Sequence, residues 1–372
     1  MSFRTILIAT ALATTLTVPV AARTNPDDGF VITAEEVEGA GAEDGRVIHL
    51  AGNVTITRGE ATLVGQRGTY YEARGLAVVF GDVRGVDGES TISCDTLRYY
   101  RDLDRAYLIG NATYSDTSGV TRARRINIYR PERLAVCLGD AVAVDHDGTF
   151  ELSAGRILYD FDREEARASE APVMRTFDDE GAQEGRLSAA LIELSPGDDR
   201  IAAFGGAEIA TADVSARSRL AVLSGEGDSV ELLGDPVVDQ DGDLLSGERI
   251  LVFLSEGEVS RVVALDGARV DYTIESESPS DPDQTGHVDG DTLRMYFEDG
   301  EPVLTTVRGG ATSEHRVAET GERNTVASRE IDVLFFEGEI RRVVFRGKAS
   351  GVYVFASDET PAEDAAAAPR EG

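Results

Sequence analysis

The residue types that most often carry chemistry are scattered along this chain rather than gathered. Its four histidines are His49, His146, His287 and His315. None of them pairs with another at i, i+4 and no cysteine cluster accompanies them, so no zinc site is predicted. The chain also lacks a G-x-S-x-G nucleophile elbow and a phosphate-binding glycine loop. These observations indicate a protein that is not an enzyme and that uses no metal or cofactor.

One acidic stretch resembles the start of a calcium loop, because Asp239, Asp241 and Asp243 alternate as its first ligands would. The glycine that such a loop needs at its sixth position is Leu244 here, and the glutamate expected at the twelfth is Ile250. Aspartate and glycine are also favoured in tight turns. We therefore interpret this stretch as a hairpin turn.

The two cysteines, Cys94 and Cys137, are expected to remain free thiols. Cys94 falls in a column of small residues that we place on an inward face. Cys137 is out of phase with the alternating run Leu134, Val136, Leu138, which we also place inward. Side chains on opposite faces cannot form a disulfide unless the backbone moves.

A repeat of 29 residues organises the chain. Gly-Asn or Gly-Asp dipeptides begin at Gly52, Gly81, Gly110 and Gly139, each 29 residues after the one before. Within a unit, apolar residues at every second position alternate with short polar turns, which predicts antiparallel strands, roughly three of ~5–6 residues each. Looser units continue to Phe355. Units of this size cannot bury an apolar face alone and must stack on one another.

The beginning of the chain has the features of a signal peptide. Arg4 precedes an apolar run, and small residues up to Ala22 provide a cleavage site. The mature protein is therefore expected to be exported. The expected segments are a signal peptide at 1–22, one β-repeat module at 30–170, a second, continuous module at 171–356, and a disordered acidic tail at 357–372.

The charge of the chain limits its partners. Lys and Arg number 36 against 68 Asp and Glu, which gives a formal net charge of −32. Such a surface repels phosphates, so nucleic acid is excluded as a partner. We interpret the acidic residues as a solvated outer face that keeps a long β structure soluble.

Two short motifs connect the repeat to a known family. The first consists of Gly52, Asn53, Val54, Ile56, Gly59, Leu63 and Tyr70, and the second of Gly110, Ala123, Ile126 and Tyr129. This pattern resembles the OstA-like family of lipopolysaccharide export proteins, which includes LptA, LptC and the periplasmic part of LptD. The resemblance spans almost the whole mature chain.

The resemblance implies an all-β fold: an elongated antiparallel β-jelly-roll, or "β-taco", in which two facing sheets enclose an apolar interior. It also implies a periplasmic lipid-binding protein that shields the acyl chains of lipopolysaccharide, or of a related glycolipid, between the inner and outer membranes. An association of the protein with the outer membrane stays open. Its expected partners are this lipid, other OstA-like domains joined by edge-strand pairing, and further copies of itself head to tail.

The resemblance also implies which residues contact the lipid. The groove candidates are Val54, Ile56, Leu97, Tyr99, Ile126, Ile128, Leu134, Val136, Ile157 and Ile192. Arg122, Arg124 and Arg125 are candidates for the lipid phosphates, because guanidinium groups match phosphate geometry.

Two other functions fit parts of the sequence. One is a structural envelope repeat protein with a filled core and no ligand. The other is a parallel β-helix enzyme acting on polysaccharide, since such folds have rungs of similar length. Short turns such as 130–133 favour hairpins, and hence antiparallel strands, over the second alternative.

Overall fold

A computed structural model describes residues 31–42, 45–225, 228–255, 258–274, 284–317, 321–336 and 339–355. The predicted signal peptide at 1–22 and the predicted tail at 357–372 lie outside these ranges. Within them the chain forms β-strands and short 3-10 helices. None of its helices there is long and apolar enough to span a membrane.

The strands follow one another with short connections. The first part contains β1 (Val31–Thr33), β2 (Glu36–Ala42), β3 (Gly45–Arg58), β4 (Ala61–Tyr71), η2 (Glu72–Arg74), β5 (Leu76–Asp87), β6 (Ser90–Tyr100), η3 (Arg101–Leu103), β7 (Arg105–Ser115), β8 (Gly119–Tyr129), β9 (Leu134–Asp145), β10 (Phe150–Asp160), β11 (Glu165–Ser169), β12 (Val173–Phe177), β13 (Gln183–Ser188) and β14 (Leu191–Ser195).

The second part contains η4 (Pro196–Asp198), β15 (Arg200–Ala210), β16 (Val214–Ser224), β17 (Ser229–Leu233), β18 (Val237–Gln240), β19 (Asp243–Ser246), β20 (Arg249–Ser255), β21 (Glu258–Ile274), β22 (Gln284–Glu298), β23 (Glu301–Arg308), β24 (Thr312–Val317), β25 (Arg323–Ala327), β26 (Glu330–Phe336), β27 (Glu339–Arg346) and β28 (Ser350–Val354).

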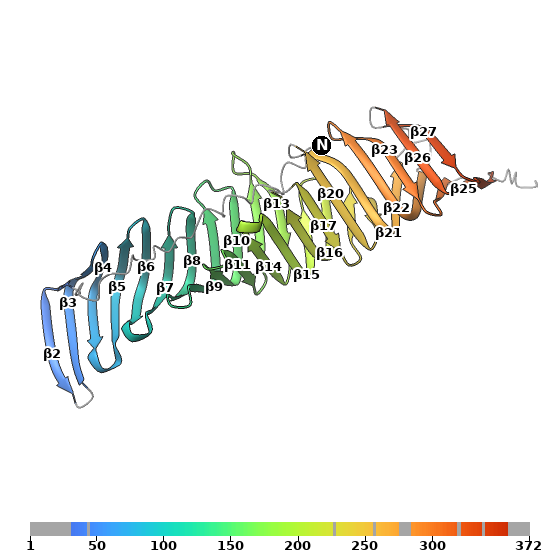
Figure 1. Cartoon of the computed structure of the whole chain (residues 1–372). Helices are drawn as coiled ribbons and strands as arrows, with labels where there is room; N and C mark the ends of the chain where they lie inside the picture. Colours follow the sequence, from blue (N-terminus) through green and yellow to red (C-terminus); the bar gives the residue numbers. More distant parts are fainter. Residues whose placement is uncertain are drawn as a thin grey trace, which may run out of the picture.

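All these strands belong to one hydrogen-bonded sheet, and every pairing among them in the described ranges is antiparallel. The strands lie side by side in nearly sequential order, so the molecule is an elongated ladder that runs from β2 at one end to β27 at the other (Figure 1). This confirms the predicted all-β, elongated antiparallel fold. The antiparallel pairing also rules out the parallel β-helix.

The Gly-Asn and Gly-Asp dipeptides are β-bulges in the middle of long strands. The register shifts at Gly81-Asp82 in β5 and at Gly110-Asn111 in β7, where the four backbone φ angles are between 45° and 84°. Bulges of this kind bend a strand while its hydrogen bonds continue on both sides. Because the bulges recur in alternate strands from β3 to β9, the sheet folds along one line.

The fold line divides the sheet into two facing walls. Wall A comprises Leu76–Phe80 of β5 and the segments of the other strands on the same side of the fold line. Wall B comprises Val83–Asp87 of β5 and the segments on the other side. Both walls contribute to one hydrophobic core, for example Leu97 from wall A and Leu152 from wall B. The edge of each wall that lies away from the fold line is called the rim here.

The prediction of three short strands per unit is wrong. The sequence from Arg105 to Asp145 contains three strands of 11 to 12 residues, and two of them run through a Gly-Asn or Gly-Asp dipeptide. A glycine followed by Asn or Asp adopts the left-handed conformation of a bulge as readily as that of a turn. Periodicity alone therefore placed strand ends where the strands only bend.

The predicted boundary between modules falls where long strands that cross the fold line are followed by separate, shorter strands in each wall. After β10, the two walls are formed by separate strands, β11 in wall A and β12 in wall B, and β10 pairs with both. The ladder therefore continues through this region without a gap. The division into modules at residues 170 and 171 stays a prediction.

Candidate functional site

The interior between the walls is the candidate functional site. Directly paired residues of neighbouring strands share a face, and in wall A they form one inward row next to the fold line. We call it the central row: Val37, Leu50, Gly68, Val79, Leu97, Leu108, Ile126, Cys137, Ile157, Ala168, Ile192, Ala203, Ala221, Leu232, Ile250, Ala264, Leu293, Val307, Ile331 and Phe345.

No polar side chain interrupts the central row from β2 to β27. Most of its members are buried, and Leu108, Ile157 and Ile250 are each 0% exposed. At the N-terminal end the row finishes at Val37, which is 61% exposed. The described chain therefore has a continuous apolar interior along its length.

Tyrosines enter this interior in the N-terminal part of the molecule. Tyr159 of wall A is almost fully buried, and its hydroxyl lies 3.2 Å from Oγ1 of Thr121 on wall B, so this hydrogen bond joins the two walls. Tyr99 donates to Oδ1 of Asp104 at 2.9 Å. Burial raises the pKa of Tyr114 to about 12, so its hydroxyl stays protonated at neutral pH.

Eight of the ten groove candidates face the interior. They are Val54, Ile56, Leu97, Tyr99, Ile126, Ile128, Ile157 and Ile192. Val54, Ile157 and Ile192 are each 0% exposed, whereas Ile56, Tyr99 and Ile128 are half-buried. The fold thus brings these residues together, and whether they bind lipid stays a prediction.

The inward placement of Leu134 and Val136 is wrong. In β9 the core side chains are Ala135 and Cys137, and Val136 is paired with Asn127 on the outer face. All five residues from 134 to 138 are apolar, so alternation could not tell the two faces apart. The smaller side chains point inward because the large residues Ile157 of β10 and Ile126 of β8 fill the space beside them.

The correction changes the argument about the thiols but not its outcome. Cys94 and Cys137 are both buried in the same core, on different rows, and both are free. Burial raises the pKa of Cys94 to about 11 and that of Cys137 to about 12, so neither is a reactive thiolate near neutral pH.

The three phosphate candidates lie outside the interior. Arg122 is exposed on the outer face of wall B, and Arg125 is exposed on the outer face of wall A, where its guanidinium stacks 5.1 Å from the Tyr107 ring centroid. Arg124 sits at the fold line and pairs with Asp140 at 2.8 Å. The fold does not bring these arginines to the groove, and a role with phosphate stays a prediction.

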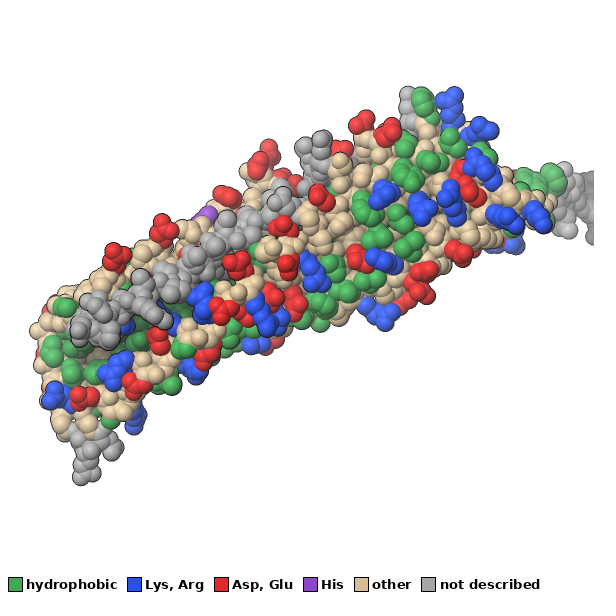
Figure 2. Space-filling model, in the orientation of Figure 1, with side chains coloured by type: hydrophobic (Ala, Val, Ile, Leu, Met, Phe, Trp, Pro, Cys, Tyr) green, Lys and Arg blue, Asp and Glu red, His purple; other side chains and the backbone are tan. Residues whose placement is uncertain are grey.

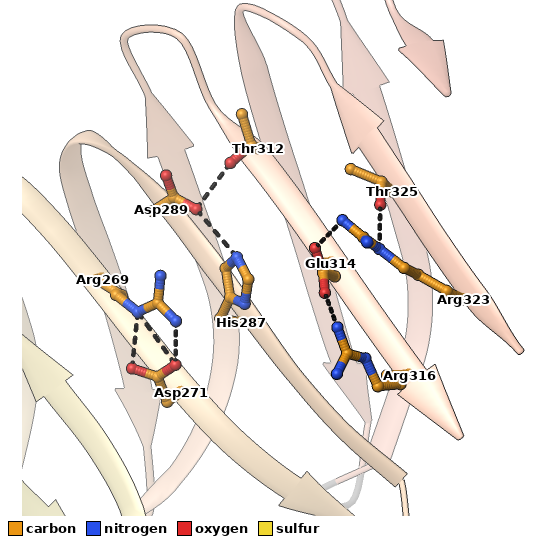
Figure 3. A network of polar contacts seen from close by, with 9 residues as sticks. All are labelled: Arg269, Asp271, His287, Asp289, Thr312, Glu314, Arg316, Arg323 and Thr325. Carbon is orange, nitrogen blue, oxygen red and sulfur yellow. Dashed lines mark hydrogen bonds and ion pairs between the residues drawn. The ribbon is translucent and has the colours of Figure 1, made fainter. Parts of the chain in front are cut away.

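Charged side chains of the C-terminal part pair on the outer face of wall B (Figure 3). Arg269 donates to both carboxylate oxygens of Asp271, and this contact lowers the pKa of Asp271. Nε2 of His287 is 3.6 Å from Asp289, and Glu314 pairs with two arginines of the same face. Three of these contacts join residues of one strand, and the pair between Glu314 and Arg323 links β24 with β25.

The predicted hairpin turn at 239–242 is confirmed. β18 and β19 pair across it, and Oδ1 of Asp239 accepts a hydrogen bond from the Gly242 amide at 3.1 Å. Within the described ranges, no three His, Cys, Asp or Glu side chains are grouped so that they could hold a metal ion.

The sequence did not reveal that the interior differs between its two parts. In the C-terminal part, hairpins of wall A have a second bulge near the rim, for example at Phe253 and Leu254. They add the half-buried inner residues Phe297 and Phe335 beyond the central row. Figure 2 shows apolar and cationic side chains together over β20 to β26, with a few acidic ones among them.

The two ends of the ladder are open. In the described chain, β2 pairs only with β3, and at the other end β27 pairs only with β26. Apolar side chains are exposed at both ends, among them Val37 at 61% and Val352 at 66%. Edges of this kind can pair with a further strand.

Comparison with known proteins finds a weak structural likeness. No protein-family model and no curated protein matches the chain. Among solved structures it is similar to LptH, the LptA homologous periplasmic component of the conserved lipopolysaccharide transport device from Pseudomonas aeruginosa. That likeness covers 39% of this chain and 84% of LptH, with 17% identity and a TM-score of 0.26. A likeness with this TM-score and identity supports no conclusion about this chain. The fold described above follows from the strand pairing alone.

Proposed function

We propose that this chain is a periplasmic lipid-binding and transfer protein of the OstA-like type. It would carry lipopolysaccharide, or a related glycolipid, from the inner to the outer membrane by shielding the acyl chains between its walls. The observation that supports this most is the central row, which stays apolar from β2 to β27. Transfer of this kind needs no bond to be made or broken, so no catalytic residue is required.

The energetics favour a long groove over a single pocket. Each CH₂ group taken from water into an apolar interior is stabilised by about 0.8 kcal/mol. A multi-acyl lipid would therefore bind tightly to one deep pocket and leave it slowly. A row of similar apolar positions, such as Leu232, Ile250 and Leu293, offers nearly equal affinity at each step, so the lipid can move along it.

Loading requires the walls to separate. Ile157 and Ile192 are 0% exposed, so no acyl chain can reach them in this closed arrangement. The rim-side residues Ile128 and Met295 are half-buried and would meet a lipid first. Tyr159 and Thr121 hold the walls together in the N-terminal part, so we expect lipid to enter more easily where such a hydrogen bond is lacking.

Photocrosslinking tests the proposal in cells whose glycolipid can be detected on a blot. A photoreactive phenylalanine would replace Ile128 or Met295 on the inner face. Matched controls are Val136, which is on the next strand to Ile128 but faces outward, and Tyr296, which follows Met295 and also faces outward. We expect glycolipid adducts from the two inner positions, at least tenfold above the two outer ones.

Adducts at all four positions would indicate surface adhesion and contradict the proposal. If a folded, exported protein gave no adduct at either inner position, the interior would be an ordinary filled core. The chain would then be a structural envelope repeat protein, which the near-zero exposure of the central row also allows.

The open ends suggest how the protein meets its partners. A second copy could add its β2 to β27 with the antiparallel direction that the ladder requires, so that Val37 extends the central row beside Phe345. In that register Glu36 would lie opposite Arg346, and Glu38 would lie between Arg346 and Arg342. Head-to-tail copies, or other OstA-like domains with the same edges, would thus continue the apolar interior.

Reversing the charges of the first edge tests this pairing. We expect the wild-type chain to self-associate with rising concentration and the double variant Glu36→Arg, Glu38→Arg to remain monomeric, because four like charges would then face each other. Sedimentation velocity at low and high salt measures the difference. Asp241→Arg, in the exposed turn between β18 and β19, is the control. Equal association of all three proteins would contradict pairing through β2.

A further inference from the structure

In the C-terminal part of the interior, the inner face of wall B is apolar near the fold line and polar near the rim. Next to the fold line it carries apolar residues such as Val270 and Val288, which pack against the core. A second inward row lies two positions nearer the rim along each strand. It consists of the directly paired residues Tyr272, Gly286, His315 and Asn324. We call it the polar row. Its side chains are half-buried or exposed.

The polar row is shaped by the glycine at its centre. A Cβ atom on Gly286 would lie 2.4 Å from the hydroxyl oxygen of Tyr272, so the tyrosine side chain crosses β22 where no side chain opposes it. On the other side of Gly286, Nε2 of His315 lies 2.9 Å from Oε1 of Gln284. A phenol, an imidazole and two amide side chains are therefore adjacent on one inner surface.

The rim-side part of wall A is mainly apolar. Met295, Phe297, Val333 and Phe335 of wall A face inward there and are packed against the core. One exception is Thr305, which is paired with Met295 and is 8% exposed; its buried hydroxyl has no hydrogen-bond partner. A buried hydroxyl without a partner is costly, and a ligand oxygen would remove that cost. This section of the groove is thus amphipathic across its width.

The charges of the polar row favour a neutral ligand group over a phosphate. The row contains no lysine or arginine. Asp243 lies on the same face, and its carboxylate interacts with Tyr272 and would repel an anion. Tyrosine, histidine and amide side chains instead supply the mixed donors and acceptors that match sugar hydroxyl groups.

We propose that the polar row binds the sugar head group of an amphiphile whose acyl chains lie on the apolar inner face of wall A. The inference rests on the proposed lipid-binding function and adds to it. The lipid is oriented in this section, with its sugar against Tyr272, His315 and Asn324 and its chains against Met295 and Phe297. Sugars would thus be bound within the mouth of the groove as well as standing in water beyond it.

Binding of three C12 detergents to the full chain, below their critical micelle concentrations, tests the inference. Dodecyl maltoside provides a sugar head group, dodecylphosphocholine a phosphate, and lauryldimethylamine oxide only a small polar group. Titration calorimetry compares wild type with His315→Ala and Asn324→Ala. The control is His287→Ala, because His287 is on β22 but faces outward (Figure 3).

Each of the two test variants is expected to raise the Kd for dodecyl maltoside about three- to tenfold, the range that one neutral hydrogen bond contributes. The Kd for lauryldimethylamine oxide should stay the same, and His287→Ala should change neither. Equal weakening for all three detergents, no weakening, or weakening for dodecylphosphocholine alone would each overturn the inference while leaving the groove intact. If none of the detergents bound the wild-type chain, the proposed function would fail together with it.

Discussion

Replacing Ile157 by aspartate is expected to lower the free energy of unfolding by at least about 4 kcal/mol. Ile157 is in the central row, fully buried between Cys137 and Ala168 of the neighbouring strands. The variant loses the packing of the isoleucine and places a carboxylate where no donor is available. Such a loss is a large part of the ~5–15 kcal/mol that stabilises an ordinary domain. Urea unfolding followed by circular dichroism measures it.

The neighbouring residue provides the control. Leu158 is on the same strand but faces outward, where it is paired with Val136 and Arg167. Leu158→Asp is expected to cost about 1 kcal/mol or less, because water can reach the new carboxylate. Since each strand contacts only nearby strands, hydrogen exchange in Ile157→Asp should rise mainly from β8 to β14. Uniform exchange over all described strands would contradict this local picture.

Replacing Gly110 by valine is expected to destabilise the protein by about 3 kcal/mol or more. Gly110 opens the bulge of β7 with a φ of +77°, a conformation that β-branched residues avoid. A Cβ atom there would also lie 2.1 Å from Oδ2 of Asp95, which accepts a hydrogen bond from Asn111 at 3.1 Å. The valine would therefore strain the backbone and displace the contact that fixes the bulge.

Gly267→Val separates these two causes. Gly267 belongs to the bulge of β21 and has a φ of +74°, but nothing lies within 4 Å of the position its Cβ would take. It should show only the backbone cost, about 1–2 kcal/mol. Urea midpoints of the two variants give the difference directly. A Gly267→Val protein as unstable as Gly110→Val would mean that the contact with Asp95 has no effect.

Much of the fold could be predicted from sequence because the repeat constrains it. The spacing of Gly52, Gly81, Gly110 and Gly139 correctly predicted a stacked repeat, and the structure places these glycines at the fold line, where a residue tolerant of positive φ is needed. Short polar turns correctly predicted antiparallel hairpins. The spacing could not show that the strands continue through these glycines instead of ending there, because bulges and turns use the same residue types.

The candidate site could be predicted only in part, and the reason is the composition of the strands. Where one face is polar, as around Ile126 and Ile128, alternation assigned the interior correctly. In β9 both faces are apolar, so Val136 was placed on the wrong side. The polar row at Tyr272, His315 and Asn324 could not be predicted, because its members come from three strands that do not follow the 29-residue spacing.

The order of the strands also bears on how the chain reaches this structure. From β2 to β28 each described strand pairs with strands that are close to it in sequence. Such low contact order allows folding to begin with any hairpin and to proceed by adding the next. Because β2, β3 and β4 precede most other strands in the sequence, they can pair before the later strands leave a ribosome or a membrane pore. A polypeptide that enters a compartment in unfolded form could therefore assemble its ladder while it is still being delivered.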